Sequence, residues 1–345
     1  MALKDIIQEI AKLSTADQYR LKEFFTKSLA SYSTSEPVFK EVSERKHKDG
    51  FTCSHCHSNN AVRFGKYYVK MGSRTLERQR YRCKECGKTF TDVTNTPLYH
   101  THLPHKWLEF VQCMIEGYSL RKSAELLKVH YVTLFYWRHK LLSAIKEMDF
   151  DQFEGIVEMD ETYFLYSEKG KRKVEGRKAR KRGGSSSQRG ISKEQVCVLV
   201  ARDRQKANSK VVGQGRIVKT RLEAAIGSKL TPTNVLCTDA WRAFMTYAKE
   251  KGLEHYRFKS DGKERVRGVY HIQNVNSYHS RLKGWLNRFN GVATKYLDHY
   301  LSWFQFLDQI KHKNGDTTVS KMIVESCLFS MNATFDKLRL SEFTK

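Results

Sequence analysis

The stretch GIVEMDETYF, residues 155–164, decides the fold, because it carries Asp160 inside a run that otherwise has the pattern of a buried strand. QVCVLVARD at 195–203 is a second strand pattern. A third, within NVLCTDAWRAF at 234–244, is followed at once by Asp239 and a helical pattern. Strands that mix with helices on this scale predict an α/β domain.

Three polar residues share one face of a helix predicted further along. In NVNSYHSRLKGW, residues 274–285, Asn276, His279 and Lys283 stand at positions i, i+3 and i+7. Two aspartates from adjacent strands and an Asn carbonyl oxygen can hold Mg²⁺ or Mn²⁺ ions for attack on a phosphodiester. Lys283 would hold a phosphate, and His279 would do the same or help protonate the leaving oxygen. Taken singly, such an Asp is usually a turn residue and Asn276 a helix cap, so the ordered triple carries the prediction.

The third position of this triple carries no acid. Asn276 can neither act as a base nor carry charge, so the acids near Asp160 matter. Glu158 points to the same strand face as Asp160 and is an extra candidate ligand, whereas Glu161 points to the opposite face unless the strand bulges there. We therefore predict a supporting or structural role for Glu161, and His271 is a further possible helper.

Four cysteines form two CxxC pairs, Cys53 with Cys56 and Cys83 with Cys86. Two such knuckles joined by a β-hairpin present four thiolates tetrahedrally to a structural zinc ion, and the nearby His55 is not needed as a ligand. Four unrelated buried thiols would not fall into two well-formed pairs. The remaining cysteines lie in apolar runs and are predicted to be core residues: Cys113, Cys197, Cys237 and Cys327.

Residues 119–142, SLRKSAELLKVHYVTLFYWRHKLL, have the pattern of two short helices joined by a tight turn. Ser119 can cap the first helix, and the second begins near Val132 or Thr133. A basic second helix of this kind is the usual reader of the DNA major groove, although an ordinary helical hairpin has the same pattern. The residues of the helix-turn-helix predicted to contact DNA are Thr133, Tyr136, Arg138, His139 and Lys140.

The charge of the chain favours a nucleic acid partner. Lys and Arg number 62 against 37 Asp and Glu, a net charge of +25, and contacts of such residues with phosphates release counterions. The segment 168–192 is basic and then rich in Gly and Ser. It is either a mobile loop without a role or a clamp on the DNA backbone, and its place after Asp160 favours the clamp. Its predicted DNA contacts are Arg177, Lys178, Arg180, Lys181 and Arg182.

Other features bound the class of protein. No run of about 18 apolar residues is present and the first residues lack the order of a signal peptide, so we expect no membrane association and an intracellular protein. Disulfides are rare in that compartment, which favours metal binding by the paired cysteines. The predicted domains are a short helical element and linker (1–45), a zinc ribbon (46–95), a helix-turn-helix (100–150), the α/β catalytic domain (151–320) and a C-terminal tail (321–345).

These segments resemble the DDE-type insertion-sequence transposases, in the zinc-ribbon branch known as the insertion-sequence 1595 family. The resemblance is carried by VEMDETYF around Asp160, RKRGGSSSQRGISKEQVCVLVARDR at 180–204, LCTDAWRAF around Asp239, and VNSYHSRLKGW followed by TKYLDHYLSWFQF. In that branch the third catalytic position is often Asn with Lys seven residues later, the DDNK pattern, which Asn276 and Lys283 match. The resemblance extends from about residue 53 to about residue 307.

The resemblance implies a ribonuclease-H-like mixed sheet flanked by helices and a catalytic divalent metal, Mg²⁺ or Mn²⁺. It also implies cleavage of terminal inverted repeats and strand transfer into target DNA. The expected partners are double-stranded DNA, as element ends and as target, and further copies of the chain in a homo-oligomer on that DNA. Such a protein would be cytoplasmic and associated with a prokaryotic nucleoid.

Two other functions stay open. A DNA-binding regulator without chemistry, such as a decayed transposase, would fit the absent third acid, but it has no reason to keep both Asp160 and Asp239. A ribonuclease-H-like nuclease or resolvase without strand transfer would not need so large a basic DNA-reading front half. The agreement of independent signals therefore favours the transposase.

Overall fold

A computed structural model describes residues 3–22, 35–71, 74–148, 152–179, 183–259, 264–311, 318–329, 331 and 333–343. The chain divides into two compact units. The first unit is Met1–Trp137 with Thr317–Asn332, and the second unit is Arg138–Asp316 with Ala333–Lys345. The division falls within helix α6, Tyr131–Lys146. Each unit is described by itself.

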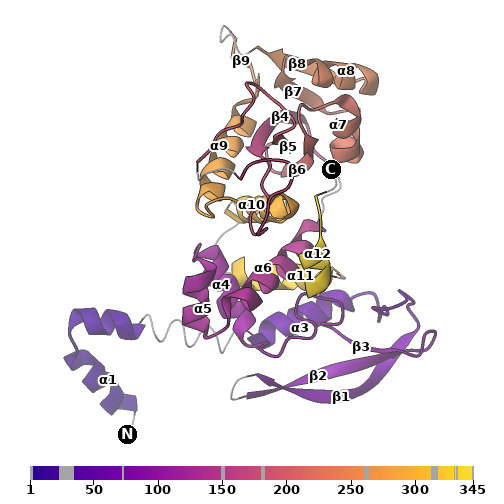
Figure 1. The fold of residues 1–345 in the computed structure, drawn as a ribbon. Helices are drawn as coiled ribbons and strands as arrows, with labels where there is room; N and C mark the ends of the chain where they lie inside the picture. Colours follow the sequence, from indigo (N-terminus) through magenta and orange to yellow (C-terminus); the bar gives the residue numbers. More distant parts are fainter. Residues whose placement is uncertain are drawn as a thin grey trace. The chain divides into compact units, whose positions relative to one another are not determined.

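The sheet of the first unit is a long hairpin with one short added strand (Figure 1). Strands β1 (Ala61–Met71) and β2 (Arg74–Cys83) are antiparallel, and β3 (Thr89–Thr91) pairs with β2. The pairing of β1 with β2 shifts around Gly65, whose φ of +73° favours glycine at this bulge. The predicted hairpin between the two cysteine pairs is therefore confirmed.

Helices make up the rest of the first unit. They are α1 (Leu3–Lys12), α3 (Ser35–Lys46), α4 (Lys106–Ile115), α5 (Leu120–Leu127), the start of α6, and α11 (Thr318–Leu328). Helix α11 packs against α3 and α4, although the sequence patterns placed most of α3 in a linker and most of α11 in a tail. Val38 and Val42 stand one turn apart on α3 and are both buried. Tertiary packing thus stabilises a helix that its polar sequence does not predict.

A five-stranded mixed sheet forms the centre of the second unit (Figure 1). Its strands are β4 (Ile156–Leu165), β5 (Gln195–Arg202), β6 (Ala207–Gln214), β7 (Val235–Asp239) and β8 (Glu254–Phe258). The spatial order is β6-β5-β4-β7-β8. The first three strands in sequence are antiparallel neighbours, while β7 is parallel to both β4 and β8. This order confirms the expected ribonuclease-H-like mixed sheet.

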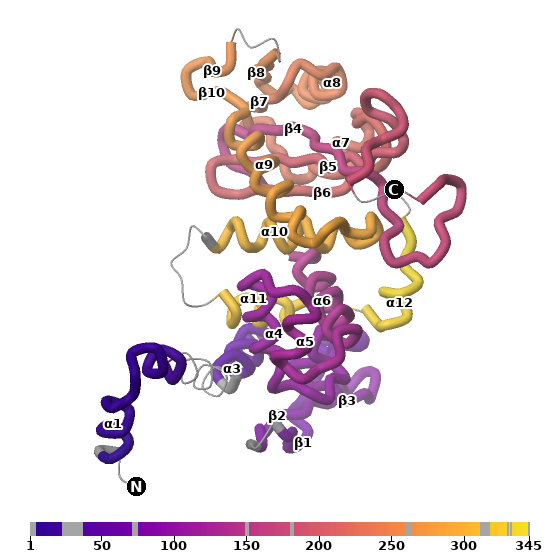
Figure 2. Tube along the Cα trace, turned by 60° about the vertical axis from the view of Figure 1, so that its left-hand side comes forward, coloured from indigo at the N-terminus to yellow at the C-terminus, as the bar shows by residue number. Residues whose placement is uncertain are grey.

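Helices cover both faces of this sheet (Figure 2). Helices α7 (Lys219–Ile226) and α8 (Arg242–Lys251) bury apolar side chains against one face, where Val157 and Met159 lie in the main core. Helices α9 (Gln273–Asn287) and α10 (Leu297–Lys311) pack on the other face. Side chains alternate along a strand, so the even-numbered positions of β4 around Met159 face α9.

Smaller elements complete the second unit. They are β9 (Val266–Arg267), β10 (Tyr270–His271), the 3₁₀ turns η1 (Gly227–Lys229) and η2 (Thr294–Tyr296), and α12 (Phe335–Leu340). Strands β9 and β10 pair as a separate small hairpin just before α9. Across both units, the described helices include none with the length and apolar character needed to cross a membrane.

Candidate functional site

Three carboxylates from two strands meet at one point of the second unit. Asp160 and Glu161 lie on β4, and Asp239 is the last residue of β7. One carboxylate oxygen of each lies within 4.8 Å of one from each of the others. The structure thus brings together the two aspartates that the sequence paired and adds Glu161 to them. These three residues are called the acidic cluster.

The cluster lies where the pairing of two parallel strands ends. Strands β4 and β7 pair from Ile156↔Val235 to Met159↔Thr238, and the next residue on each strand is one of the two aspartates. Because β7 stops there, side chains from both faces of β4 can reach Asp239. The two-residue alternation of a strand placed Glu161 away from this point, so the sequence patterns predicted only a supporting or structural role for it.

Burial and mutual repulsion make the cluster unfavourable in its ionised form. Burial, followed by the charge of Asp239, raises the pKa of Asp160 to about 7. Burial, followed by the charges of both aspartates, raises the pKa of Glu161 to about 7. Burial also raises the pKa of Asp239. Crowded, partly desolvated carboxylate oxygens are the ligands that Mg²⁺ and Mn²⁺ prefer, and such an ion would relieve the repulsion, so these residues fit a divalent metal.

Helix α9 brings basic residues to the cluster. The Nδ1 atom of His279 lies 3.6 Å from Oδ2 of Asp160. The charge of Lys283 acts to lower the pKa of Asp160 against the larger effect of burial. Burial, and then Lys283, lowers the pKa of His279 to about 4, so its ring is neutral near pH 7. Asn276 lies one turn before His279 with its side chain exposed, and its place among the metal ligands stays a prediction.

Glu158 does not belong to the acidic cluster. Its buried carboxylate accepts hydrogen bonds from the backbone N–H groups of Asn274 (2.8 Å) and Val275 (3.0 Å), in the first turn of α9. It also accepts from Nδ2 of Asn274 and from Arg204, and His271 lies 3.1 Å away. The hypothesis of an extra metal ligand is therefore wrong. Glu158 holds the helix N-terminus, where a carboxylate is favoured, and His271 contacts Glu158.

The sequence patterns did not single out Arg216, a cation that lies near Asp239 in the structure. The exposed guanidinium of Arg216 stands 4.1 Å from the ring centroid of Trp241. Asp239 accepts a hydrogen bond from the backbone N–H of Trp241 at 2.9 Å, and the charge of Arg216 acts to lower the pKa of Asp239. Arg216 and Asp239 lie far apart in the sequence and form no recognisable motif, so only the folded structure shows that they are neighbours.

The four paired cysteines converge in the first unit. The four Sγ atoms all lie within 4.8 Å of one another. The Sγ atoms of Cys53 and Cys86 are 3.7 Å apart, and those of Cys56 and Cys83 are 3.6 Å apart. Thiolates bound tetrahedrally to zinc at about 2.3 Å stand roughly 3.8 Å apart. Backbone N–H groups of the knuckle, that of Cys86 first, lower the pKa of Cys83 to about 7. The cluster therefore fits a structural zinc ion.

His55 and the four remaining cysteines lie outside the four-cysteine cluster. His55 lies with its Nε2 atom 3.2 Å from the carbonyl of Thr89, which agrees with a four-cysteine ligand set. The cysteines expected in the core are all buried: Cys113, Cys197, Cys237 and Cys327. They are thiols.

The two helices of the predicted helix-turn-helix are present as α5 and α6, but part of the predicted contact surface is buried. Ser119 caps α5 by accepting a hydrogen bond from the N–H of Lys122, and Lys128 ends it with a left-handed φ of 52°. Arg138 is 3% exposed and stands over the rings of Phe289 and Trp303, within the second unit.

His139 is buried as well. Its ring is 0% exposed, stacks on Tyr296 and faces His299, with 2.9 Å between the Nδ1 atoms. Helix α6 uses these positions for its own packing, so the assignment of Arg138 and His139 to DNA contact is wrong for this conformation. The side chains of Thr133, Tyr136 and Lys140 are half-buried and keep partial access to solvent.

The basic insertion is anchored within the second unit. Arg177 is half-buried and pairs with Glu168 at 3.4 Å, while Lys178 is exposed. Glu194 accepts hydrogen bonds from Ser186 and Ser187 in the Gly/Ser-rich part. The other predicted contacts, Arg180, Lys181 and Arg182, lie outside the described residues.

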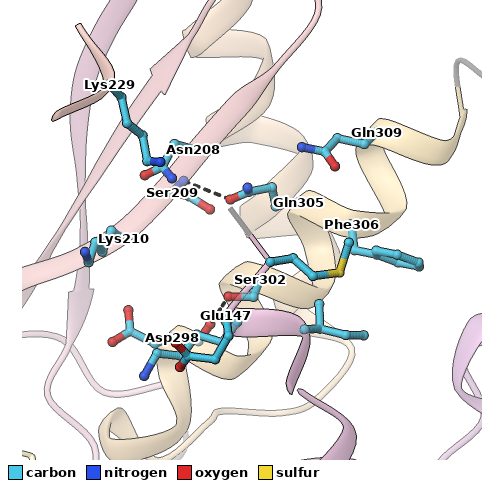
Figure 3. Close-up of a pocket in the computed structure, with 13 residues that line it drawn as sticks. Glu147, Asn208, Ser209, Lys210, Lys229, Asp298, Ser302, Gln305, Phe306 and Gln309 are labelled. Atoms are coloured by element: carbon cyan, nitrogen blue, oxygen red, sulfur yellow. Dashed lines mark hydrogen bonds between the residues drawn. The ribbon is translucent and has the colours of Figure 1, made fainter. Parts of the chain in front are cut away.

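A polar cavity of about 280 Å³ lies apart from the acidic cluster, between β6 and α10 (Figure 3). Gln305 reaches across it and accepts a hydrogen bond from the backbone N–H of Ser209 at 3.2 Å. Lys210 and Lys229 also line it. It contains no member of the acidic cluster, and we assign it no catalytic role.

Comparisons with known proteins find several chains that are similar to this one. One relative, named "Uncharacterized protein in transposable element ISH50" from Halobacterium salinarum, is 28% identical over 285 residues, covering 81% of this chain and 92% of its own. Among solved structures, a simian T-cell lymphotropic virus intasome with a PP2A regulatory subunit matches at 11% identity and a TM-score of 0.27, over 60% of this chain and 70% of that one. A pre-cleavage Mos1 transpososome matches at 14% identity and a TM-score of 0.22, over 64% and 77%.

The family resemblance does not depend on those two structures. Residues 152–307 match the model of the ISXO2-like transposase domain. This span runs from just before β4 to near the end of α10, so it contains the whole acidic cluster together with α9. Both the match and the relative from a transposable element agree with the resemblance carried by the sequence motifs. Residues 152–307 are therefore similar to the ISXO2-like transposase domain, and the resemblance to the insertion-sequence 1595 transposases is supported.

Proposed function

We propose that this protein is a DDE-type transposase that binds the terminal inverted repeats of an insertion sequence, cleaves the DNA ends and transfers the strands into target DNA. The observation that carries the proposal is the acidic cluster, formed by remote strands inside the transposase domain. A purely DNA-binding protein has no use for three repelling, half-buried acids at one point.

The acidic cluster would hold the catalytic Mg²⁺ or Mn²⁺. Asp160 and Asp239 are the principal ligands, with Asn276 at the third position of the family pattern. Glu161 supplies the carboxylate that Asn276 lacks, which argues against loss of activity through a missing acid. A bound divalent ion activates the attacking hydroxyl group and stabilises the leaving oxygen.

Residues around the cluster would position the DNA backbone. Lys283 and Arg216 act on Asp160 and Asp239 respectively, so a phosphate at the cluster would lie between two cations. His279 is neutral near pH 7. It therefore offers a ring nitrogen near Asp160 rather than a positive charge, and the contact with phosphate falls to Lys283 and Arg216.

DNA recognition would use the first unit. The hairpin of β1 and β2 is narrow enough for a DNA major groove, which accepts a two-stranded ribbon. Arg80 and Arg82 on it are exposed, and both stand over the ring of Phe64, at 5.2 and 5.3 Å. Thr133 and Tyr136, near the start of α6, would add contacts as in other helix-turn-helix proteins. Lys140, Arg177 and Lys178 would contribute phosphate contacts, and two element ends would be joined by more than one copy of the chain.

A cleavage assay tests the proposal. The substrate is duplex DNA carrying the ends of the element that encodes the chain, and the full chain is supplied with Mg²⁺ or Mn²⁺. We expect nicking at the element end and joined products with the wild type, and loss of both in Asp239→Ala. Glu250→Gln, an exposed acid on α8, is the matched control and should keep full activity. Retained cleavage in Asp239→Ala would contradict the proposal, and DNA binding without cleavage by the wild type would instead favour a regulator.

A further inference from the structure

A large cavity lies beside the acidic cluster in the second unit. Its volume is about 850 Å³, within the range of pockets that bind small ligands. Its walls come from the end of β4 and the residues after it, the start of the basic insertion, the second half of α9 and the loop before α10. The cleavage scheme above uses Lys283 and Arg177 from its walls but gives the cavity itself no role.

Hydrogen bonds hold the wall formed by the start of the insertion in place. The N–H of Ser167 donates to Oγ1 of Thr294, and the N–H of Thr294 donates to the carbonyl of Ser167, both at 2.8 Å. The ammonium group of Lys169 donates to three carbonyl groups, those of residues 289, 290 and 291, just after α9. These contacts join the insertion to the end of α9, so the opening has a defined shape.

The lining combines aromatic and apolar surface with positive charge. Phe164 and Tyr166 line it from the β4 side, and the buried Leu286 and Leu297 line it from the helix side. Among the described lining residues the cations are Lys169, Lys171, Arg177 and Lys283, and the only acid is Glu168, which pairs with Lys171 and Arg177. The cavity therefore suits a ligand with a flat ring and a negative charge.

Two elements lead from the acidic cluster into this cavity. Asp160 and Phe164 stand on the same face of β4, about 13 Å apart at the usual rise of a strand. On α9, His279 beside Asp160 is followed one turn later by Lys283 and then by Leu286. Lys283 lines the cavity and also acts on the charge of Asp160. A DNA strand held at the cluster would therefore lie near the lining residue Lys283.

We propose that this cavity receives one unpaired nucleotide of the DNA strand held at the acidic cluster, with its base against Phe164 and Tyr166 and its phosphate toward Lys283. The inference rests on the proposed function, because it takes the ligand to be DNA. Removing a base from the duplex costs a few kcal/mol, which stacking on aromatic side chains offsets. The site would therefore favour DNA ends that are frayed, mismatched or already unpaired next to the cleavage point.

Binding of two matched probes tests the inference. Both are fluorescein-labelled duplexes with a three-nucleotide 3′ overhang, of thymidines in one and of abasic sites in the other. Anisotropy is measured with the full chain without Mg²⁺ or Mn²⁺. The wild type should bind the thymidine probe about tenfold more tightly, the effect of one lost base stack. Tyr166→Ala should remove this difference and Tyr166→Phe should keep it. Equal binding of both probes by the wild type would overturn the inference.

A second measurement applies even if Tyr166→Ala does not fold. A 5-iodouracil base in the overhang should form a photo-crosslink with the wild-type segment 163–171, located by peptide mapping. Crosslinks confined to other segments would overturn the inference. Binding of a blunt duplex and metal-dependent cleavage are measured in parallel, since failure of the proposed function would abolish these, whereas failure of the nucleotide site alone would leave them intact.

Discussion

The four-cysteine site and the acidic cluster both gather metal ligands, but the chain assembles them in different ways. Each cysteine pair is made by one tight turn, so only a single hairpin is needed to bring the two pairs together. The acidic cluster forms only when β4 and β7, which are distant in the sequence, pair side by side in one sheet. Local turns can be recognised in a sequence, whereas the meeting of distant strands must be inferred.

The two sites also differ in how the protein tolerates them without metal. Knuckle N–H groups lower the pKa of Cys83 toward the thiolate form that zinc binds. The pKa of Cys56 is raised instead, because burial and the three neighbouring thiols outweigh a backbone hydrogen bond at Ser58. Hydrogen bonds to Asp160 and Glu161 also act to lower the pKa of these two acids, but burial outweighs them and raises both. The cysteine site should therefore support the fold through its metal, while the acidic cluster should cost the fold stability in exchange for chemistry.

The largest effect is expected from Cys83→Ser. Structural zinc sites contribute about 10–16 kcal/mol of binding free energy that is at the same time folding free energy. We expect loss of zinc, measured as metal per chain, and loss of amide protection in β1 and β2 by hydrogen exchange. His55→Ala, next to the knuckle but outside the ligand set, is the control and should keep its zinc. A Cys83→Ser protein with full zinc and a protected hairpin would break the comparison.

Glu158→Gln should cost the fold about 3 kcal/mol. The carboxylate accepts from the first turn of α9 and from Arg204, and Gln can replace only part of these bonds while leaving the guanidinium without its partner charge. Urea unfolding measures the loss. Glu154→Gln, an exposed acid paired with Lys206, is the control and should change stability by under about 0.5 kcal/mol. An equal, small effect of both substitutions would show that Glu158 does not hold α9.

Asp160→Asn should stabilise the fold while abolishing cleavage. The pKa of Asp160 is raised to about 7, so the wild type loses stability as the pH rises from about 4 to about 7. In buffer free of Mg²⁺ and Mn²⁺ the Asn variant should gain on the order of 2 kcal/mol at pH 8 and almost nothing at pH 4. Denaturant unfolding at both pH values measures this gain. A less stable variant at pH 8 would mean that the cluster does not strain the fold.

The smallest effects are expected from single cations of the hairpin. Arg80→Ala or Arg82→Ala should weaken DNA binding several-fold and lower the slope of log affinity against log salt by about 1 each. Titrations at several salt concentrations measure both quantities. Lys251→Ala, which removes an exposed cation from α8, serves as the control. An unchanged salt slope in both arginine variants would show that the hairpin does not contact the DNA backbone.

Much of the site was predictable because its signals are local. The cysteine knuckles, the Ser119 cap and the two aspartates in strand patterns each depend on a few adjacent residues, and the structure has them as expected. Predictions failed where a side chain's surroundings come from distant segments. Arg138 and His139 belong to a basic helix by sequence, yet packing buries them.

Acids that look alike in the sequence diverge for the same reason. Glu158 stands two residues before Asp160 on β4 and Glu161 directly after it, and alternation favoured Glu158 as the ligand. In the structure the backbone N–H of Asn274, at the start of α9, donates a hydrogen bond to the carboxylate of Glu158. Strand β7 ends at Asp239, so the carboxylate of Glu161 lies close to that of Asp239.

The sequence by itself determined that the chain is basic, that four cysteines form a knuckle pair, and that two aspartates stand in strand patterns of an α/β domain. Periodicity and spacing carry this information because turns and strands are local structures. Only the tertiary structure decided which of two glutamates joins the aspartates, which helix residues are buried, and that a cavity opens beside the acids. These outcomes depend on contacts between segments far apart in the chain, and no short stretch of sequence records such contacts.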